Sequence, residues 1–541
     1  MTSSANPAPF EEPASLRARV QQFESQIAER DALLEQRAAA IARHEATIQQ
    51  HEATIERLHE QMRLLLARRF GASSEKLPDG QLGLFNEAEA ETGEEPEAEA
   101  GTEVAAHRRA RAKRAPLPDT LERVDIEHEL AESERTCAHH GVELERFAEV
   151  VSEQLDIVPA KVRVLRHIRG KYRCPSCEGH IRTAAMPAQP LPKSFASPGL
   201  LAYIVTAKYV DGLPLYRQQQ QFGRIGVELS RTTLARWVVG MGELVVPLMN
   251  LLHEELLGRA YLLMDETTVQ VLKEPGKAPE SKSQLWAMMS PGPEPPIVVF
   301  EYDPTRSGDV PRRLLAGFAG ALHTDGYSGY GPAVREYDLV HLACWAHGRR
   351  GFTDVLKSLG LNAKKLPSNP PAKARRALHA LQRIRTLYAI ERRIRDEPPE
   401  ERRRVRQAES VPVLDALRAW LDDTLAKVPP SSPLGKAMAY LDNQWPALVR
   451  YCDDGRYGID TNAVENSIRP FCLGRRSWLF ADTVAGARAS ARLYSLVQCA
   501  KVNGLEPYTY LRRVFTELPR AQSLADIEAL LPTRLTAADL T

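Results

Sequence analysis

Long apolar runs, a secretion signal and a cysteine framework are all missing from this sequence. It contains no run of about 18 apolar residues that could span a bilayer. The first residues, MTSSANPAPFEEPAS, have neither the basic start nor the apolar core of a signal peptide. Only seven cysteines occur in 541 residues, and four of them are isolated in the sequence: Cys344, Cys452, Cys472 and Cys499. This pattern argues against a secreted disulfide scaffold, so we expect reduced thiols and a cytoplasmic protein.

The sequence also has little net charge, but its charges are unevenly distributed. The 71 Lys and Arg residues against 70 Asp and Glu residues give a formal charge of +1. Residues 87–103 nevertheless contain eight glutamates and no basic residue, whereas residues 161–240 contain 13 basic and 3 acidic residues. Such blocks indicate segments with separate roles. A chain of this length exceeds what one hydrophobic core supports, so we expect three or more domains.

Alternating four- and three-residue spacings between Leu16 and Leu65 predict a coiled coil. One seam position is apolar throughout: Val20, Ile27, Leu34, Ile41, Ile48, Ile55 and Met62. The other seam position is polar in the middle of the segment: Arg30, Arg37, His44 and His51. The β-branched residues favour two strands and hence a homo-oligomer. The alternative is an amphipathic helix that packs against its own protein.

The cysteines that do form pairs lie in a region expected to be zinc-ribbon-like. Cys174 and Cys177 form a C-x2-C pair, and Cys137 with His140 supplies a second pair of the same spacing. Three sulfurs and one nitrogen complete a tetrahedral zinc shell, so we predict a structural Zn²⁺ that stabilises this small region. His139 competes with His140 for the fourth position, and a single C-x2-C can also be a chance pair or a redox motif.

Residues 191–257 are expected to be helical and to contain a helix-turn-helix. A helix that ends at Gly226, the turn VEL and a second helix capped by Ser230 have the dimensions of this motif. The residues expected to contact DNA lie at the start of the second helix: Arg231, Thr232, Thr233 and Arg236. Helix pairs with short turns are common, and it is the positive charge of the region that favours DNA as the partner.

After residue 258, short apolar runs broken by Pro and Gly replace the helical periodicity. Three strands, a helix, a strand, a helix and a strand predict an α/β domain with a mixed sheet. Asp265 ends the apolar run YLLM of the first strand, and Asp325 ends the run ALHT of the fourth. Neighbouring strand ends can bring both carboxylates within reach of one ion. Either aspartate alone could equally be a turn residue.

A third carboxylate, Glu465, lies in the basic segment GIDTNAVENSIRPFCLGRRSWLF. A hard divalent cation such as Mg²⁺ (or Mn²⁺) binds carboxylates, water and phosphate oxygens, and two such ions promote in-line displacement at phosphorus. On this hypothesis Glu465 binds metal with Asp265 and Asp325. The neighbouring basic residues then contact the phosphates of a nucleic acid: Arg469, Arg475 and Arg476.

These motifs resemble those of the insertion sequence 66 family of transposases, and the resemblance runs from the predicted coiled coil to the C-terminus. The residues that carry it are RRFGASSEKL, YVDGLPLYRQ with SRTTLARWV, LLMDETTVQVL, HTDGYSGY, CWAHGRRGF, DTNAVENSIRP with GRRSWLFADTVAGARASARLYSL, and GLEPYTYL. The resemblance implies a DDE enzyme with an RNase H-like core and with Asp265, Asp325 and Glu465 as its acidic triad. It also implies a helical insertion at 351–455, small accessory transposition proteins as partners, and a bacterial, nucleoid-associated location. Family members usually have four cysteines in the zinc-ribbon region, and CAHHG departs from that pattern.

Several further polar residues near these motifs have both functional and structural interpretations. His347 and Arg349 in CWAHGRR could contact the scissile phosphate or the DNA, or could serve the fold. Asn462 could orient Glu465, contact DNA or cap its helix. Glu266 should point away from Asp265 in a strand and is not expected to be a ligand. The stretch RRIRDEPPEERRRVRQ (392–407) carries both charges, which favours a solvated helical face.

The sequence therefore predicts a multidomain α/β transposase that binds the terminal inverted repeats of a mobile element, cleaves its ends and joins the 3′-hydroxyl to target DNA. The alternatives are a nuclease of the same fold that does not join strands, and an inactive DNA-binding regulator. The expected domains are a coiled coil (14–70), a disordered linker (71–119), the zinc-ribbon-like region (120–190), the helix-turn-helix region (191–257), the core (258–350 and 456–505) with its insertion (351–455), and a helical tail (506–541).

Overall fold

A computed structural model of the chain describes residues 13–70, 125, 162–173, 181–361 and 367–540. The chain divides into two compact units, one formed by residues 94–186 and the other by residues 1–93 and 187–541. In the smaller unit, β1 (Lys171–Arg173) pairs antiparallel with β2 (Ile181–Thr183). The predicted zinc ligands lie outside the described residues: Cys137, His140, Cys174 and Cys177.

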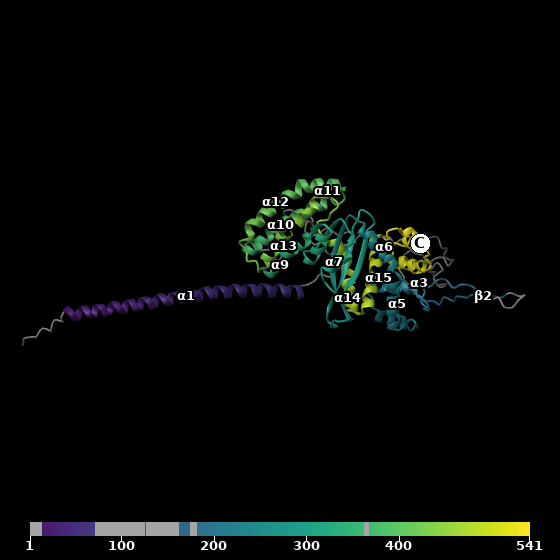
Figure 1. Ribbon diagram of the computed structural model, residues 1–541, viewed down its shortest axis with the longest axis horizontal. Coiled ribbons are helices and arrows are strands. Elements are labelled where there is room, and N and C mark those ends of the chain that lie inside the picture. Colours follow the sequence, from purple (N-terminus) through teal and green to yellow (C-terminus); the bar gives the residue numbers. More distant parts are fainter. Residues whose placement is uncertain (1–12, 71–124, 126–161, 174–180, 362–366, 541) are drawn as a thin grey trace, which may run out of the picture. The chain divides into compact units, whose positions relative to one another are not determined.

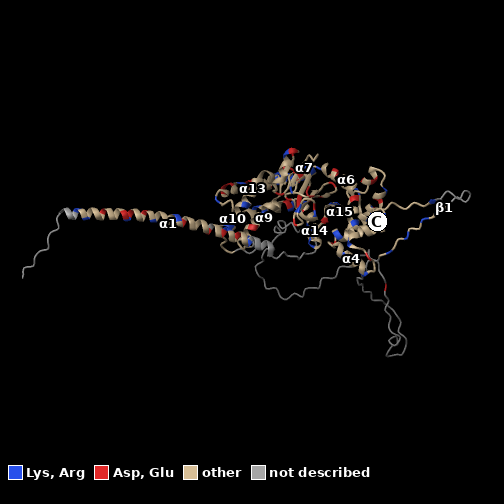
Figure 2. Cartoon of the chain, turned by 60° about the horizontal axis from the view of Figure 1, so that its bottom comes forward, with Lys and Arg blue, Asp and Glu red and all other residues tan. Residues whose placement is uncertain are grey.

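In the larger unit, α1 (Pro13–Phe70) is one continuous helix over the predicted coiled-coil segment. The apolar seam residues from Val20 to Met62 are exposed in the single chain. Figure 2 shows acidic and basic residues interspersed along this helix. Towards its end, Glu60 and Glu56 accept hydrogen bonds from Lys373 at 2.8 and 3.1 Å. A helix with an unburied apolar seam gains stability when a partner covers that seam.

Between residues 187 and 260, all of which are described, the chain forms the helices α3 (Pro198–Tyr209), α4 (Leu215–Arg224), α5 (Arg231–Leu244) and α6 (Val246–Leu257). The Ser197 and Ser230 side chains cap α3 and α5 by accepting from the backbone N–H groups of Leu200 and Thr233. Among the described helices, no single one is long and apolar enough to cross a membrane, and the pair α5 and α6 passes that test only together, across a 48° bend.

The centre of the larger unit is a mixed sheet, as the alternation of short apolar runs predicted. Its strands are β3 (Tyr261–Lys273), β4 (Lys282–Ser290), β5 (Ile297–Asp303), β6 (Ala321–Thr324) and β7 (Val340–Ala343). They lie in the order β5-β4-β3-β6-β7. The first three strands pair antiparallel, and β6 and β7 join them in parallel. The short β8 (Ala481–Thr483) extends the far end of β3.

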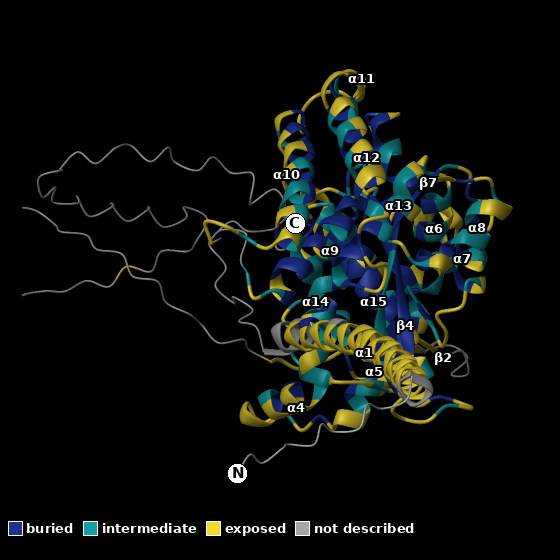
Figure 3. Cartoon of the chain, turned by 90° about the vertical axis from the view of Figure 1, so that its left-hand side faces the viewer, coloured by how far each residue is buried: buried dark blue, intermediate teal, exposed yellow. Residues whose placement is uncertain are grey.

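Helices cover the sheet and exclude water from its central strands. The helices α14 (Asn462–Trp478) and α15 (Val484–Val502) pack against β3, β4 and β5 (Figure 1). The Ser495 hydroxyl of α15 accepts a hydrogen bond from the Phe300 backbone N–H at 2.7 Å. Figure 3 shows β4 as buried along its length, consistent with its uninterrupted burial from Ser283 to Ser290. Short helices α7 (Asp309–Leu314) and α8 (Gly331–Glu336) connect β5, β6 and β7.

A helical segment separates β7 from α14 in the sequence. It contains α9 (Trp345–Ser358), α10 (Ala372–Arg393), α11 (Pro399–Val405), a π turn (Arg406–Ser410), α12 (Val411–Leu425) and α13 (Pro433–Val449). The chain ends with α16 (Pro507–Glu517) and α17 (Leu524–Glu528). We call α10 to α13 the helical insertion.

One arginine of the helical insertion joins it to the segment that leads into α14. Arg406 is fully buried, and its guanidinium donates to both carboxylate oxygens of Glu391 at 2.7 and 2.6 Å. It also donates to the backbone carbonyls of Tyr451, Asp454 and Tyr457. The prediction of a solvated face for 392–407 is therefore wrong at Arg406, because this one side chain turns inward at the π turn.

Candidate active site

Asp265 and Asp325 occupy equivalent steps on neighbouring parallel strands. Leu263 of β3 pairs with His323 of β6, and each aspartate follows its member of that pair by two residues. Adjacent strands lie about 4.8 Å apart and their side chains alternate between faces, so residues two steps along point to the same side. The sheet register therefore brings the two carboxylates towards each other.

The prediction that Asp265 ends the first strand is wrong. The strand β3 continues to Lys273 because ETTVQVL keeps its pairing with β4, with Asp265 opposite Ala287. What ends near Asp265 is the pairing with β6, whose last bridge to β3 is at Leu263. Asp325, by contrast, directly follows β6. Asp265 thus lies in a continuous strand at the point where its parallel neighbour stops.

The electrostatic surroundings of Asp265 show that several carboxylates lie close together. Burial raises the pKa of the Asp265 carboxyl well above its usual range, and the charges of Glu465, Glu266 and Asp325 raise it further. The Glu266 backbone N–H donates to Asp265 Oδ1 at 2.8 Å and partly offsets this increase. Carboxylates that repel one another in this way favour either protonation or a bound divalent cation.

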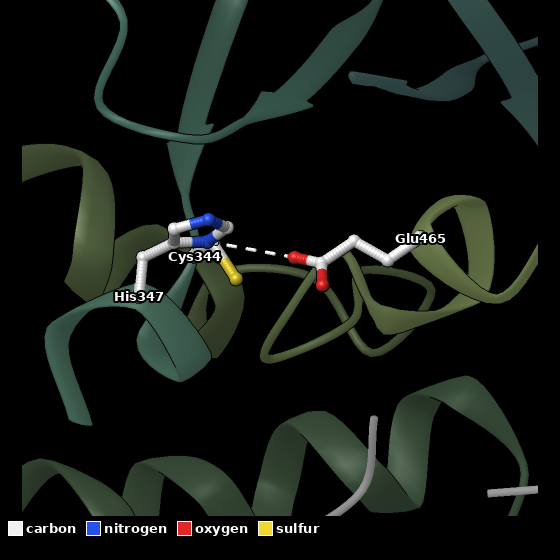
Figure 4. A group of neighbouring side chains, drawn as sticks. All are labelled: Cys344, His347 and Glu465. Carbon is white, nitrogen blue, oxygen red and sulfur yellow. Dashed lines mark ion pairs between the residues drawn. The ribbon is translucent and has the colours of Figure 1, made fainter. Parts of the chain in front are cut away.

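Glu465 lies in the first turn of α14, a helix that packs against β3 and β4, and its charge acts on the Asp265 carboxyl. Its side chain is 8% exposed. Arg350 Nη2 lies 3.5 Å from Glu465 Oε2, and His347 Nδ1 lies 3.7 Å from Oε1. Figure 4 shows His347 and Cys344 lying next to this carboxylate. We call Asp265, Asp325 and Glu465 the acidic cluster.

The start of α14 is held against the junction between β7 and α9. The Thr461 backbone N–H donates to Cys344 Sγ at 3.4 Å. The Trp345 backbone N–H donates to the Ile459 carbonyl at 3.2 Å. Cys344 is fully buried, and burial raises the pKa of its thiol to about 12. These contacts place the first turn of α14, and with it Glu465, next to His347.

Asn462 helps to shape the turn that begins α14. Its backbone N–H and its side-chain amide both donate to the Asp460 carboxylate, at 3.0 and 2.8 Å. The Tyr388 hydroxyl of the helical insertion donates to the same carboxylate at 2.7 Å. Of the roles considered for Asn462, these contacts favour the structural one at the helix start. A contact of Asn462 with DNA stays a prediction.

Comparison with protein family models shows which family this chain matches. The family model described as "Transposase IS66 family" matches residues 193–489, which include the sheet, the helical insertion and the acidic cluster. The chain belongs to the IS66 transposase family. Three further models match other parts: "Transposase C of IS166 homeodomain" at 57–126, "zinc-finger binding domain of transposase IS66" at 134–178, and "IS66 C-terminal element" at 495–533.

Curated relatives of this IS66 family chain include three proteins of Sinorhizobium fredii (strain NBRC 101917 / NGR234). Uncharacterized protein y4jD is 35% identical over 77% of this chain and 81% of its own length. Uncharacterized protein y4qI is 33% identical over 78% of both chains. Uncharacterized protein y4hP is 30% identical over 76% of this chain and 75% of its own length.

The predicted basic contacts of this family member differ in exposure. Arg476 is exposed, whereas Arg469 and Arg475 are partly buried, and Arg475 Nη1 donates to Thr268 Oγ1 at 3.4 Å. Arg349 is buried, which favours a structural role, while its neighbour Arg350 faces Glu465. Arg350 was not predicted as a site residue, although it follows Arg349 directly in the motif CWAHGRR.

The helix-turn-helix prediction falls on α4 and α5, which pack against each other. Arg231, Thr232 and Arg236 are exposed on α5. Thr233 is partly buried, and its hydroxyl is hydrogen-bonded to Ser230 Oγ at 2.9 Å. The opposite face of α5 is buried by Leu234, Trp237, Val238 and Met241. The helix therefore presents a basic face that is free of core contacts.

Glu266 lies beside Asp265, where its charge acts on the Asp265 carboxyl, and its own carboxylate has partners outside the acidic cluster. Its carboxylate accepts hydrogen bonds from Arg306 Nε at 2.7 Å and from the Tyr330 hydroxyl at 2.6 Å. The Arg306 guanidinium also lies over the Tyr327 ring, 3.9 Å from its centroid. These contacts favour a structural role for Glu266, and its not being a metal ligand stays a prediction.

Proposed function

We propose that this IS66 family protein is a DDE transposase that cleaves the ends of an insertion sequence and joins the freed 3′-hydroxyl to target DNA. The observation that carries the proposal is the acidic cluster. The charges of Glu465 and Asp325, from distant segments, both act on the buried Asp265 carboxyl, and Glu465 lies in a helix that packs against the sheet. Family membership supports the transposase activity, and the cluster supplies a site for its chemistry.

An RNase H-like core is part of the proposal. Its support is the strand order β5-β4-β3-β6-β7, with three antiparallel strands followed by two parallel ones. In this arrangement the first and fourth strands of the sheet are neighbours, which is what brings Asp265 beside Asp325. The core is proposed as two parts, 258–350 and 456–505, separated by the segment 351–455, which contains the helical insertion.

The acidic cluster fits divalent cations of the magnesium type. Asp265, Asp325 and Glu465 offer oxygen ligands, and Glu465 Oε1 is buried without a hydrogen-bond partner among the described residues. When bound, Mg²⁺ or Mn²⁺ would supply the activation of water and then of the 3′-hydroxyl. The chain itself would hold the phosphate through Arg475 and Arg476 and exclude water by packing α14 on the sheet.

The remaining parts of the chain are proposed to bind DNA and to assemble the protein. The exposed basic face of α5 would contact the inverted repeats through Arg231, Thr232 and Arg236. The zinc-finger family match at 134–178 includes Cys137, His140, Cys174 and Cys177, which we propose as the zinc ligands. The exposed seam of α1 would pair with a second copy of the chain.

A strand-nicking assay on DNA that carries the element's ends tests the proposal. Asp265→Asn, Asp325→Asn and Glu465→Gln should each reduce Mg²⁺-dependent nicking by at least a hundredfold while end binding stays within twofold. Asp423→Asn is the matched control, because Asp423 is exposed on α12 and pairs with Lys427. Nicking by any of the three variants at the wild-type rate would refute the assignment.

A second assay separates transposition from simple nuclease activity. Pre-cut ends with a free 3′-hydroxyl are incubated with target DNA, and joined products are measured. The proposal requires joining that depends on the same three carboxylates. Nicking without joining would instead identify a nuclease of the same fold.

A further inference from the structure

Glu465 has a second set of neighbours that are not carboxylates. Cys344 Sγ, a His347 ring nitrogen and a Glu465 carboxylate oxygen all lie within 4.8 Å of one another. Cys344 directly follows β7, His347 lies in the first turn of α9, and Glu465 is in α14. Figure 4 shows the three side chains meeting at one point between these elements. We call them the Cys-His-Glu cluster.

Two atoms of this cluster are buried without the partners that buried polar atoms normally have. His347 Nδ1 and Glu465 Oε1 each lack a hydrogen-bond partner among the described residues. They lie 3.7 Å apart, which is too long for a hydrogen bond between them. Leaving buried polar atoms without partners is unfavourable, so this arrangement is expected to serve a ligand that bridges the two atoms.

The separation suits a metal ion. Bonds of about 2.0–2.3 Å from zinc to nitrogen, oxygen and sulfur at tetrahedral angles put ligand atoms roughly 3.4–3.6 Å apart. The 3.7 Å between His347 Nδ1 and Glu465 Oε1 needs only a small inward shift to reach that spacing. The Thr461 backbone N–H already donates to Cys344 Sγ at 3.4 Å, the kind of outer contact that stabilises a metal-bound thiolate.

We propose that Cys344, His347 and Glu465 bind a thiophilic divalent cation of the zinc class. Three protein ligands leave a fourth position for water or another donor, reached from the partly exposed side of His347. Thiolate and imidazole ligands select zinc over magnesium, whose preferred ligands are oxygens. The thiolate and carboxylate together neutralise the charge of the cation, and the thiol proton is released to solvent on binding.

The consequence, which rests on the proposed function, is inhibition of DNA cleavage by zinc. Glu465 belongs both to the Cys-His-Glu cluster and to the acidic cluster. A zinc ion held by Cys344 and His347 takes the Glu465 carboxylate away from Asp265 and Asp325. Zinc and magnesium therefore compete for one side chain, and zinc sets the protein to an inactive state until it is removed.

Counting bound zinc in the full-length chain tests the site without any activity measurement. The protein is equilibrated with Zn²⁺, loosely bound metal is removed by gel filtration, and zinc per chain is measured by atomic emission. Cys344→Ser and His347→Gln should each hold one zinc fewer than the wild type. Cys472→Ser is the matched control, since Cys472 is a free, partly buried cysteine whose Sγ contacts Thr267 Oγ1 rather than the cluster, and it should hold the wild-type number.

Two separate variants of the cluster make it possible to distinguish the loss of the zinc site from the loss of the fold. Circular dichroism melting shows whether either variant has lost its fold, and His347 is partly exposed, so His347→Gln is the gentler change. A folded variant that retains the wild-type zinc count overturns the site. Zinc bound at Cys174 and Cys177 contributes equally to all these proteins and cancels in the comparison.

Nicking in Mg²⁺ with added Zn²⁺ tests the competition separately. The zinc concentration that halves nicking should rise at least tenfold in Cys344→Ser relative to the wild type and to Cys472→Ser. Equal sensitivity of all three proteins overturns the competition. If no protein nicks DNA under any condition, the proposed function fails, and the zinc count still decides the site.

Discussion

Arg406 provides a test of how the helical insertion supports the candidate site. Replacing it with Ala removes a fully buried guanidinium from the Glu391 carboxylate and from three backbone carbonyls, those of Tyr451, Asp454 and Tyr457. Breaking a buried ion pair by removing one partner costs about 3–5 kcal/mol, because the other charge stays buried without compensation. Arg402 Nη2 lies 3.5 Å from Glu391 and offsets part of this loss, so we expect a value near the lower end.

Hydrogen exchange measured by mass spectrometry detects this loss locally. At 1.4 kcal/mol per factor of ten, a loss of about 3 kcal/mol corresponds to a roughly hundredfold decrease in amide protection. The decrease should appear in peptides that span 445–460, since Arg406 binds the carbonyls of this segment. Arg404→Ala is the matched control, because Arg404 is exposed and pairs only with Glu401 among the described residues, and it should leave the protection unchanged. Unchanged protection in Arg406→Ala would refute the idea that Arg406 joins the insertion to the site.

Three further predictions address the acidic cluster, DNA binding and assembly. Asp265→Asn should raise the thermal midpoint at neutral pH in metal-free buffer, because it removes a buried charge that its neighbours repel. Since the pKa of Asp265 is raised in the fold, this gain in stability should shrink as the pH falls from the raised pKa towards the ordinary pKa of an aspartate. A lower midpoint of the variant at pH 7 would contradict this prediction. Arg231→Ala should weaken binding to end DNA and reduce the slope of log K against log salt by about 1, as measured by anisotropy, whereas the exposed Arg520→Ala should leave the slope unchanged. Ile41→Asp on the exposed seam of α1 should shift sedimentation towards the monomer, with Ala46→Asp on the opposite face as the control, and equal sedimentation of both would argue against seam pairing.

The elements of the sheet could be predicted because their signals are local. Runs such as YLLM, SQLWAMM and PIVVF carry enough apolar residues to identify strands, and Ser230 identified the start of α5. The mixed α/β character of the fold was confirmed in this way. The length of β3 was not predicted, since DETT after YLLM resembles a turn in sequence. Its pairing with β4 is a tertiary effect that overrides this local preference.

The buried arginine illustrates why charge patterns do not predict individual contacts. The stretch 392–407 contains arginines at nearly every second position, and its mixed charges resemble a solvated face. Only the π turn at Arg406–Ser410 rotates Arg406 towards Glu391, while Arg403 and Arg404 stay exposed. A sequence pattern gives the average exposure of such a segment. It cannot identify the one residue that the tertiary structure buries.

Only part of the candidate site could be predicted from the sequence, because only some of its residues lie in recognisable local patterns. Asp265 and Asp325 share a context, an apolar strand followed by a carboxylate, and that context can be recognised without coordinates. The proximity of Cys344 and Glu465 cannot be recognised in this way, because the whole helical insertion separates the two residues in sequence. Cys344 and His347 have a C-x2-H spacing that suits two metal ligands, but the third residue of the cluster is distant in sequence.

The helical insertion lies between the second and third acids of the cluster in sequence, and its contacts show that it also positions the third. The loop before α14 is held by Tyr388 through Asp460 and by Arg406 through the 451–457 carbonyls. From the sheet side, the Gly458 backbone N–H donates to the Tyr261 hydroxyl at 3.0 Å. A loop fixed from both sides transmits movement of either side to Glu465, because close-packed elements shift together rather than deform separately. The helical insertion therefore helps to fix the loop from which α14, and with it Glu465, begins.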